Sequence, residues 1–132
     1  MNSDAVILLG VPLRNRLAET LLAAGYTPLE RVGMQRTITT LRREQVAGVL
    51  VDVRKCELDV LELLLNIGDV CPGLPVGLIA NRASLDRSPA MVEGFPNVVM
   101  FSESLPAEKV VDGLCRFFDS RRQPTQSSRG NL

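Results

Sequence analysis

The sequence has no histidine and no tryptophan, and it has one tyrosine and three cysteines in 132 residues. Cys56, Cys71 and Cys115 are odd in number, lack CxxC spacing and have no histidine to complete a typical zinc site. We therefore expect reduced thiols that lie partly in the core. A redox role is an alternative for Cys56 alone, because only Cys56 falls in a loop at the predicted functional end.

An excess of charge of either sign is also absent, since 15 basic and 15 acidic residues give a formal net charge of zero. Residues 1–120 hold all 15 acidic residues and 12 of the basic ones, a net charge of −3, and three later arginines restore neutrality. A slightly acidic body is poorly suited to binding a phosphate backbone, so we expect no nucleic-acid partner.

Long apolar runs are missing as well. None approaches the ~20 residues that a membrane-spanning helix needs, so no membrane association is expected. The first ten residues, MNSDAVILLG, have an acid where a secretory signal would be basic, and their apolar stretch is short. The sequence therefore predicts a cytoplasmic protein.

Five short apolar segments are predicted to be β-strands. The first, AVILL at residues 5–9, is a continuous apolar run, as expected for a strand that is buried on both faces. Pro28 favours an edge position for the second strand, and the hydrophobic surroundings of the third favour a central one. The other four strands are expected at residues 26–32, 47–53, 75–80 and 97–101.

Five segments with helical spacing or helix-start signals follow these strands. The first helix begins near Pro12, and the third is expected to bury Leu61, Leu64, Leu65 and Gly68. A modest second helix is expected to end near residue 45, a short polar fourth to span 86–93, and the last to run from 106 to about 120.

The size of the chain is that of one domain, which we place at residues 1–121. Residues 122–132 have almost nothing apolar to bury and are expected to form a disordered tail. Five strands that alternate with five helices predict an α/β fold with a parallel sheet, right-handed crossovers and helices on both faces.

Asp52 ends the third strand, where open α/β folds have their ligand crevice. Phosphoryl chemistry on an aspartate needs a divalent cation held by further carboxylates, a fixed positive charge and a hydroxyl. The neighbouring strand ends offer Leu9, Gly10, Ala80 and Ser102 instead. We therefore expect no magnesium site, no other metal or cofactor, and a structural role for Asp52 in capping the next loop or helix. A weakly used phosphoacceptor is the alternative.

Arg54 and Lys55 follow Asp52 in the same loop. We expect them to compensate the charge of Asp52 or to reach solvent. Alternatively, they let an anion bind in the crevice without a metal.

Residues 5–120 resemble the receiver domain of bacterial two-component response regulators. The segment GVLVDVRKCELDVLELL, residues 48–64, is similar to the region around the phosphoacceptor and places Asp52 at the acceptor position. AAGY, CPGLPVGLIAN and SESLPAEKVVDGL resemble the first helix-to-strand junction, the fourth strand, and the last loop and helix. The resemblance implies a flavodoxin-like, three-layer sandwich with strand order 2-1-3-4-5.

Of the reactive positions of that family, only Asp52 is kept in this sequence. The acidic pair falls on Leu9 and Gly10, the switch hydroxyl on Ala80 and the lysine on Ser102. The resemblance therefore implies a degenerate receiver that has the scaffold without the aspartyl-phosphate switch, and we do not expect an enzyme.

The favoured function is a non-catalytic signalling module that binds a sensor kinase, an effector or a second copy of itself. Receivers use the face of the fourth helix, fifth strand and last helix for dimers or effectors, which the resemblance places at residues 85–93, 98–101 and 109–118. The charged residues on that face have a plainer alternative, a solvated helix surface with pair energies of ~0.2–0.5 kcal/mol. The residues proposed for this face are Val99, Phe101, Lys109, Asp112 and Arg116.

Two other functions stay open. A working phosphoacceptor would use Asp52 as nucleophile, with Glu103 or Asp59 as an improvised metal ligand. A small-ligand binder or enzyme would use the crevice between the first and third strands, although the sequence has no GxGxxG motif after the first strand and no P-loop.

Overall fold

A single parallel sheet of five strands forms the centre of the computed structural model, which describes residues 4–55, 59–81 and 94–130. The strands are β1 (Ala5–Leu9), β2 (Thr27–Arg31), β3 (Gly48–Asp52), β4 (Val76–Ala80) and β5 (Val98–Ser102). Their order, β2-β1-β3-β4-β5, confirms the expected fold, with β2 at an edge and β3 in the centre. The carboxyl ends of the strands meet at one edge of the sheet, because the pairing is parallel and in register.

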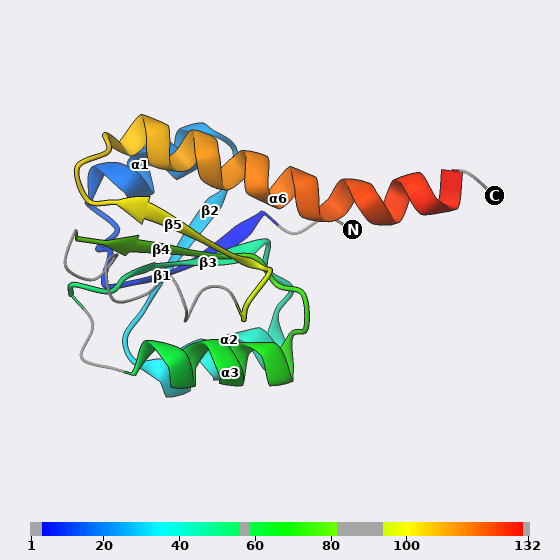
Figure 1. Cartoon of the computed structure of the whole chain (residues 1–132). Helices are drawn as coiled ribbons and strands as arrows, with labels where there is room; N and C mark the ends of the chain where they lie inside the picture. The colour runs from blue at the N-terminus through cyan, green and yellow to red at the C-terminus, as the bar shows by residue number, and fades with distance from the viewer. Residues whose placement is uncertain (1–3, 56–58, 82–93, 131–132) are drawn as a thin grey trace.

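Helices cover both faces of the sheet, as predicted (Figure 1). The helices α1 (Arg16–Ala23) and α6 (Ala107–Gly130) lie on one face, and α2 (Met34–Arg43) and α3 (Val60–Val70) lie on the other. Each face has its own hydrophobic cluster, because the fully buried strand residues alternate between the two sides. The helix expected at residues 86–93 lies outside the described residues. Within the described ranges, no helix is both long and apolar enough to cross a membrane.

Polar caps decide where two of the helices begin. The side chain of Asn15 accepts a hydrogen bond from the Leu17 amide at 2.8 Å, so α1 begins at Arg16 and not near Pro12 as expected. Asp59 caps α3 by accepting from the Glu62 amide at 3.2 Å. This contact commits Asp59 to the start of a helix.

The buried face of α3 differs from the expected one. Leu63, Leu64 and Ile67 are buried, whereas Leu61 and Leu65 are 45% and 54% exposed. Both sets have helical spacing, but the buried set continues through apolar residues at either end of the helix, and Val60 and Val70 pack against the same cluster. This longer stripe removes more apolar surface from water and therefore sets the rotation of the helix.

The last helix is longer than expected. It continues to Gly130, where the sequence predicted a helix end near residue 120 and a disordered tail at 122–132. Extending a helix that is already packed avoids the cost of a new nucleus, although Pro124 within the added segment has no N–H to donate. The added turns project beyond the sheet (Figure 1).

Glycines in two central strands allow α6 to lie close to the sheet. A Cβ atom at Gly48 would come within 2.4 Å of the Phe118 ring and 2.8 Å of the Pro75 carbonyl oxygen. A Cβ atom at Gly77 would meet Leu114 at 2.9 Å. Real Cβ contacts are not this short, so both positions exclude larger residues unless α6 moves away.

We predict that Gly48→Ala lowers the free energy of unfolding by about 1–3 kcal/mol, because the new methyl group displaces Phe118. Urea unfolding followed by circular dichroism measures the change. The matched control is Gly68→Ala on α3, where a Cβ atom has nothing within 4 Å. The control should be neutral or stabilise by about 0.5–1 kcal/mol. Equal losses in the two variants would contradict the packing described here.

Candidate functional site

Asp52 lies at the carboxyl edge of the sheet, in a pocket of about 330 Å³ between β3, β5 and the first turns of α1 and α6. The residue is 5% exposed. Of the family positions named from the sequence, Gly10, Asp52 and Ser102 line this pocket together. A carboxylate with so little contact with water needs a partner inside the protein.

Arg54 supplies that partner. Its Nε donates to Oδ1 of Asp52 at 2.9 Å and its Nη2 donates to Oδ2 at 2.7 Å, so the guanidinium binds both carboxylate oxygens. The backbone amide of Arg54 also donates to Oδ1, at 3.1 Å. Paired hydrogen bonds between a guanidinium and a carboxylate are among the strongest polar contacts in proteins. The structure thus confirms that Asp52 caps its own loop and that Arg54 compensates its charge.

The same guanidinium also reaches the neighbouring loop. Nη1 of Arg54 donates to Oε1 of Glu103 at 2.6 Å, across a sequence separation of 49 residues. Hydrogen bonding to Asp52 is the largest influence on the pKa of Arg54 and raises it above its usual value. Burial opposes this rise, and the charge of Asp52 and the contact with Glu103 add smaller contributions to it. One permanently charged side chain therefore joins the loops that follow β3 and β5.

The donor set of this pocket does not fit magnesium. Among the described residues that line it, the carboxylates are Asp52 and Glu103, and both are bound to Arg54. The adjacent end of β1 contributes Leu9 and Gly10, which carry no side-chain oxygen. Magnesium requires near-octahedral oxygen ligands, and a guanidinium between the two acids occupies the place of a cation. Within the described residues, no group of three or more His, Cys, Asp or Glu side chains could hold a metal ion.

The remaining family positions have structural roles. Gly10 turns the chain after β1 with a φ of 75°, a value that favours glycine. Ala80 is fully buried, and its carbonyl oxygen accepts from the Glu103 amide at 3.0 Å. Ser102 shares a 2.8 Å hydrogen bond with the hydroxyl of Ser104.

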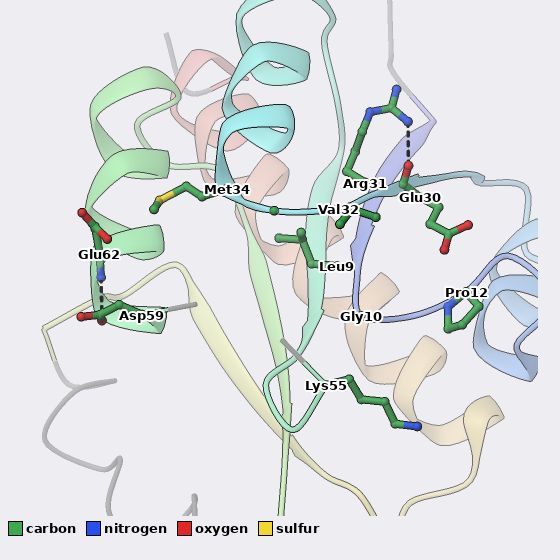
Figure 2. A pocket seen from close by; sticks show the side chains of 11 residues that line it. Leu9, Gly10, Pro12, Glu30, Arg31, Val32, Met34, Lys55, Asp59 and Glu62 are labelled. Carbon is green, nitrogen blue, oxygen red and sulfur yellow. Dashed lines mark hydrogen bonds between the residues drawn. The ribbon is translucent and has the colours of Figure 1, made fainter. Parts of the chain in front are cut away.

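Leu9 faces a different cavity, a groove of about 700 Å³ on the other side of the β1 end (Figure 2). Asp59 and Glu62 form one wall of this groove, and the loop between β2 and α2 forms the opposite wall (Figure 2). Lys55 also lines it. The lining includes acidic, basic and aliphatic residues and no aromatic ring, so it presents no single chemistry to a ligand.

The proposed interaction face is only partly at the surface. Phe101 is 7% exposed and Val99 packs in the same cluster beneath α6, so the structure places Phe101 in the core and not on a contact surface. The side chains of β5 alternate between the two sheet faces, and those of Val99 and Phe101 point toward α6.

The three residues proposed on α6 are at the surface. Lys109, Asp112 and Arg116 are exposed, and Arg116 pairs with Asp112 at 3.1 Å. The 85–93 part of this face and Cys56 lie outside the described residues.

Comparison with solved structures gives strong matches over the whole chain. A response regulator receiver protein from Sinorhizobium medicae aligns with a TM-score of 0.74 at 18% identity, covering 92% of this chain and 98% of that one. A CheY-like receiver domain protein from Methanospirillum hungatei gives a TM-score of 0.77 at 13% identity, covering 93% and 99%. NtrX from Brucella abortus gives 0.81 at 15% identity, covering 97% of this chain and 29% of the longer NtrX chain.

The chain has a receiver fold. No family model and no curated protein matches its sequence, so the likeness is one of architecture. Within the receiver fold, Asp52 stands at the end of the central strand, and the Arg54 guanidinium lies between it and the loop that follows β5.

Two contacts of this receiver fold were not expected from the sequence. The Arg54–Glu103 pair and an exposed pair between Arg16 of α1 and Glu108 of α6 both border the pocket, and the second joins residues 92 positions apart. No local pattern could have indicated either pair. The signal for the Arg54–Asp52 pair, by contrast, was present as a D-x-R spacing in a tight loop.

We predict that Arg54→Met lowers the free energy of unfolding by about 1–3 kcal/mol, because it leaves a buried carboxylate without its partner. Adding Asp52→Asn to this variant should recover part of the loss, since the amide costs less to bury unpaired. Urea unfolding measures both variants. Arg16→Met removes an arginine from an exposed pair and should leave the urea midpoint unchanged. A double variant less stable than Arg54→Met would argue against an ionised pair.

Proposed function

We propose that this chain is a non-catalytic signalling module of the receiver type, located in the cytoplasm, which acts by protein–protein interaction without a magnesium-dependent aspartyl-phosphate switch. The observation that carries the proposal is the guanidinium of Arg54, bound to both oxygens of Asp52 and to Glu103. A degenerate receiver site is one in which the acceptor is retained and its chemistry is blocked.

The ionic contact opposes phosphorylation in two ways. Both oxygens of Asp52 are engaged by hydrogen-bond donors, which reduces their availability as nucleophiles. An aspartyl phosphate would also carry about two negative charges in place of the single charge of the carboxylate, beside Glu103, and would compete with Glu103 for Arg54. Enzymes that transfer phosphoryl groups place cations against that charge, and loss of one such group costs roughly 10³–10⁵ in rate.

Signalling without phosphorylation then depends on surface recognition. The exposed side of α6 offers Lys109, Asp112 and Arg116 to a sensor kinase, an effector or a second copy. The arginine is able to form paired hydrogen bonds with a partner's carboxylate. The ion pair between the loops holds the start of α6 in one position relative to β3, so the face is ready to bind without prior modification.

We predict that incubation with acetyl phosphate and magnesium leaves the intact mass of the protein unchanged, because Asp52 is occupied by Arg54. Asp52→Asn provides the background for labelling elsewhere. An adduct on the wild-type protein that is absent from Asp52→Asn would establish the alternative, a working phosphoacceptor.

The small-ligand alternative for the crevice is tested by a thermal-shift screen of the same protein against nucleotides and flavins. A ligand that raises the melting temperature would support that function instead.

The interaction itself is tested with purified sensor kinases and effectors of the source organism, by biolayer interferometry without a phosphodonor. We predict binding with a dissociation constant on the order of micromolar, unchanged by Asp52→Asn. Lys109→Glu with Arg116→Glu should weaken that binding by about tenfold, or about 1.4 kcal/mol. Binding that requires Asp52 or a phosphodonor would contradict the proposal.

A further inference from the structure

The two helices on the face opposite α6 carry opposite charges. Residues 31–43, which include α2, contain four arginines and no acidic residue. Residues 56–81, which include α3, contain four acidic residues and no lysine or arginine. A basic helix therefore lies beside an acidic one, because α2 and α3 are neighbours on the same face of the sheet (Figure 1).

The exposed sides of these helices have matching patterns. Arg36, Thr39 and Arg43 are exposed at positions i, i+3 and i+7 of α2. On α3 the same spacing gives Glu62, Leu65 and Asp69, which are also exposed. Residues at these spacings lie along one side of a helix. Each helix thus presents two like charges separated by an uncharged residue, with the sign reversed between the helices.

These charges have no ion-pair partners among the residues that the structure describes. In the described parts of the chain, no ion pair within 4 Å includes an arginine of α2 or an acid of α3. At the centre of the acidic stripe, Leu65 is 54% exposed, and Leu61 one turn earlier is 45% exposed. Two exposed leucines one turn apart, with charges on either side, give this surface a small apolar centre with a charged rim, which is the layout of a protein interface.

We propose that this surface binds a second copy of the chain through a two-fold axis that runs between α2 and α3, parallel to them. Both helices connect parallel strands, so they run in the same direction, and this axis places α2 of each copy over α3 of the other. Each basic stripe then meets an acidic stripe, twice in the dimer. An axis across the helices would place α2 on α2 and α3 on α3, where like charges repel.

The dimer is expected to be weak and sensitive to salt. Two helices of about 15 Å each cover less than the ~800 Å² per partner of a standard stable interface. The ion pairs select the orientation and add only ~0–1 kcal/mol each at an exposed surface, while Leu65 and Leu61 provide the apolar contact. Salt screens such charges over about 8–10 Å, so raised ionic strength should dissociate the dimer.

This surface lies on the opposite face of the sheet from α6, and none of its stripe residues lines the Asp52 pocket. The inference therefore goes beyond the function proposed above and does not rest on it. A protein that dimerises through α2 and α3 and also accepts phosphate would support this proposal and contradict the other. A monomer that binds a kinase would contradict this proposal and support the other.

The test is sedimentation equilibrium of the full chain from about 10 µM to about 500 µM, the range in which a weak interface associates. The expected result is a mass that rises from 14.4 kDa towards the dimer with concentration and falls again in high salt. A protein that stays monomeric at the highest concentration overturns the proposal.

Charge reversal then identifies the surface. Variant A, Arg36→Glu with Arg43→Glu, makes both stripes acidic, and variant B, Glu62→Lys with Asp69→Lys, makes both basic. Each variant alone is expected to be monomeric because its stripes repel. An equal mixture of A and B is expected to form a heterodimer, because both of its contacts join opposite charges. The four changes combined in one chain should restore the homodimer.

The outcomes are decisive in either direction. Dimers that persist in A and B would show that the chain associates elsewhere and would overturn the proposal, as would a mixture that fails to assemble. Circular dichroism confirms that each variant is folded.

The apolar contact is tested separately. Leu65→Gln should weaken dimerisation by about tenfold. The control is Leu22→Gln on α1, on the other face of the sheet, where Leu22 is 63% exposed, and it should leave dimerisation unchanged.

Discussion

The end of the central strand carries a carboxylate that is 5% exposed to water, and the surrounding structure is arranged to neutralise it. An ionised group at this depth is tolerated only with a close counter-charge and satisfied hydrogen bonds. Arg54 meets both requirements, because its guanidinium and its backbone amide contact Asp52. Open α/β folds bind ligands at this edge of the sheet, and here the edge is held by a contact internal to the protein.

That contact links parts of the chain that would otherwise be independent. Through Glu103, Arg54 connects the loop after β3 to the loop that leads into α6, and Arg16 ties α1 to the first turn of α6. Both links border the same pocket. The elements that converge on the pocket are thus joined to one another by charged side chains, which favours a single arrangement of the carboxyl edge over two alternating ones.

Local patterns were enough to predict the five strands and the role of Asp52 as a loop cap, since each depends on residues close together in sequence. The strand order, in contrast, was expected only from the resemblance to receiver domains. The orientation of α3 was missed because Leu61 and Leu65 have helical spacing too, although the longer apolar stripe from Val60 to Val70 was visible in the sequence. The partner of Glu103 was not predictable, because the contact spans 49 residues. The length of α6 was missed because composition alone cannot report that a packed helix continues.

The short spacing between Asp52 and Arg54 has a consequence for how the chain folds. Closing a loop of two residues removes little chain entropy compared with closing one of 49, so the ionic pair is able to form before distant strands are in place. The counter-charge of the acid is therefore only two residues away at whatever stage the central strand is buried, so that burial need not leave an isolated charge in an apolar environment.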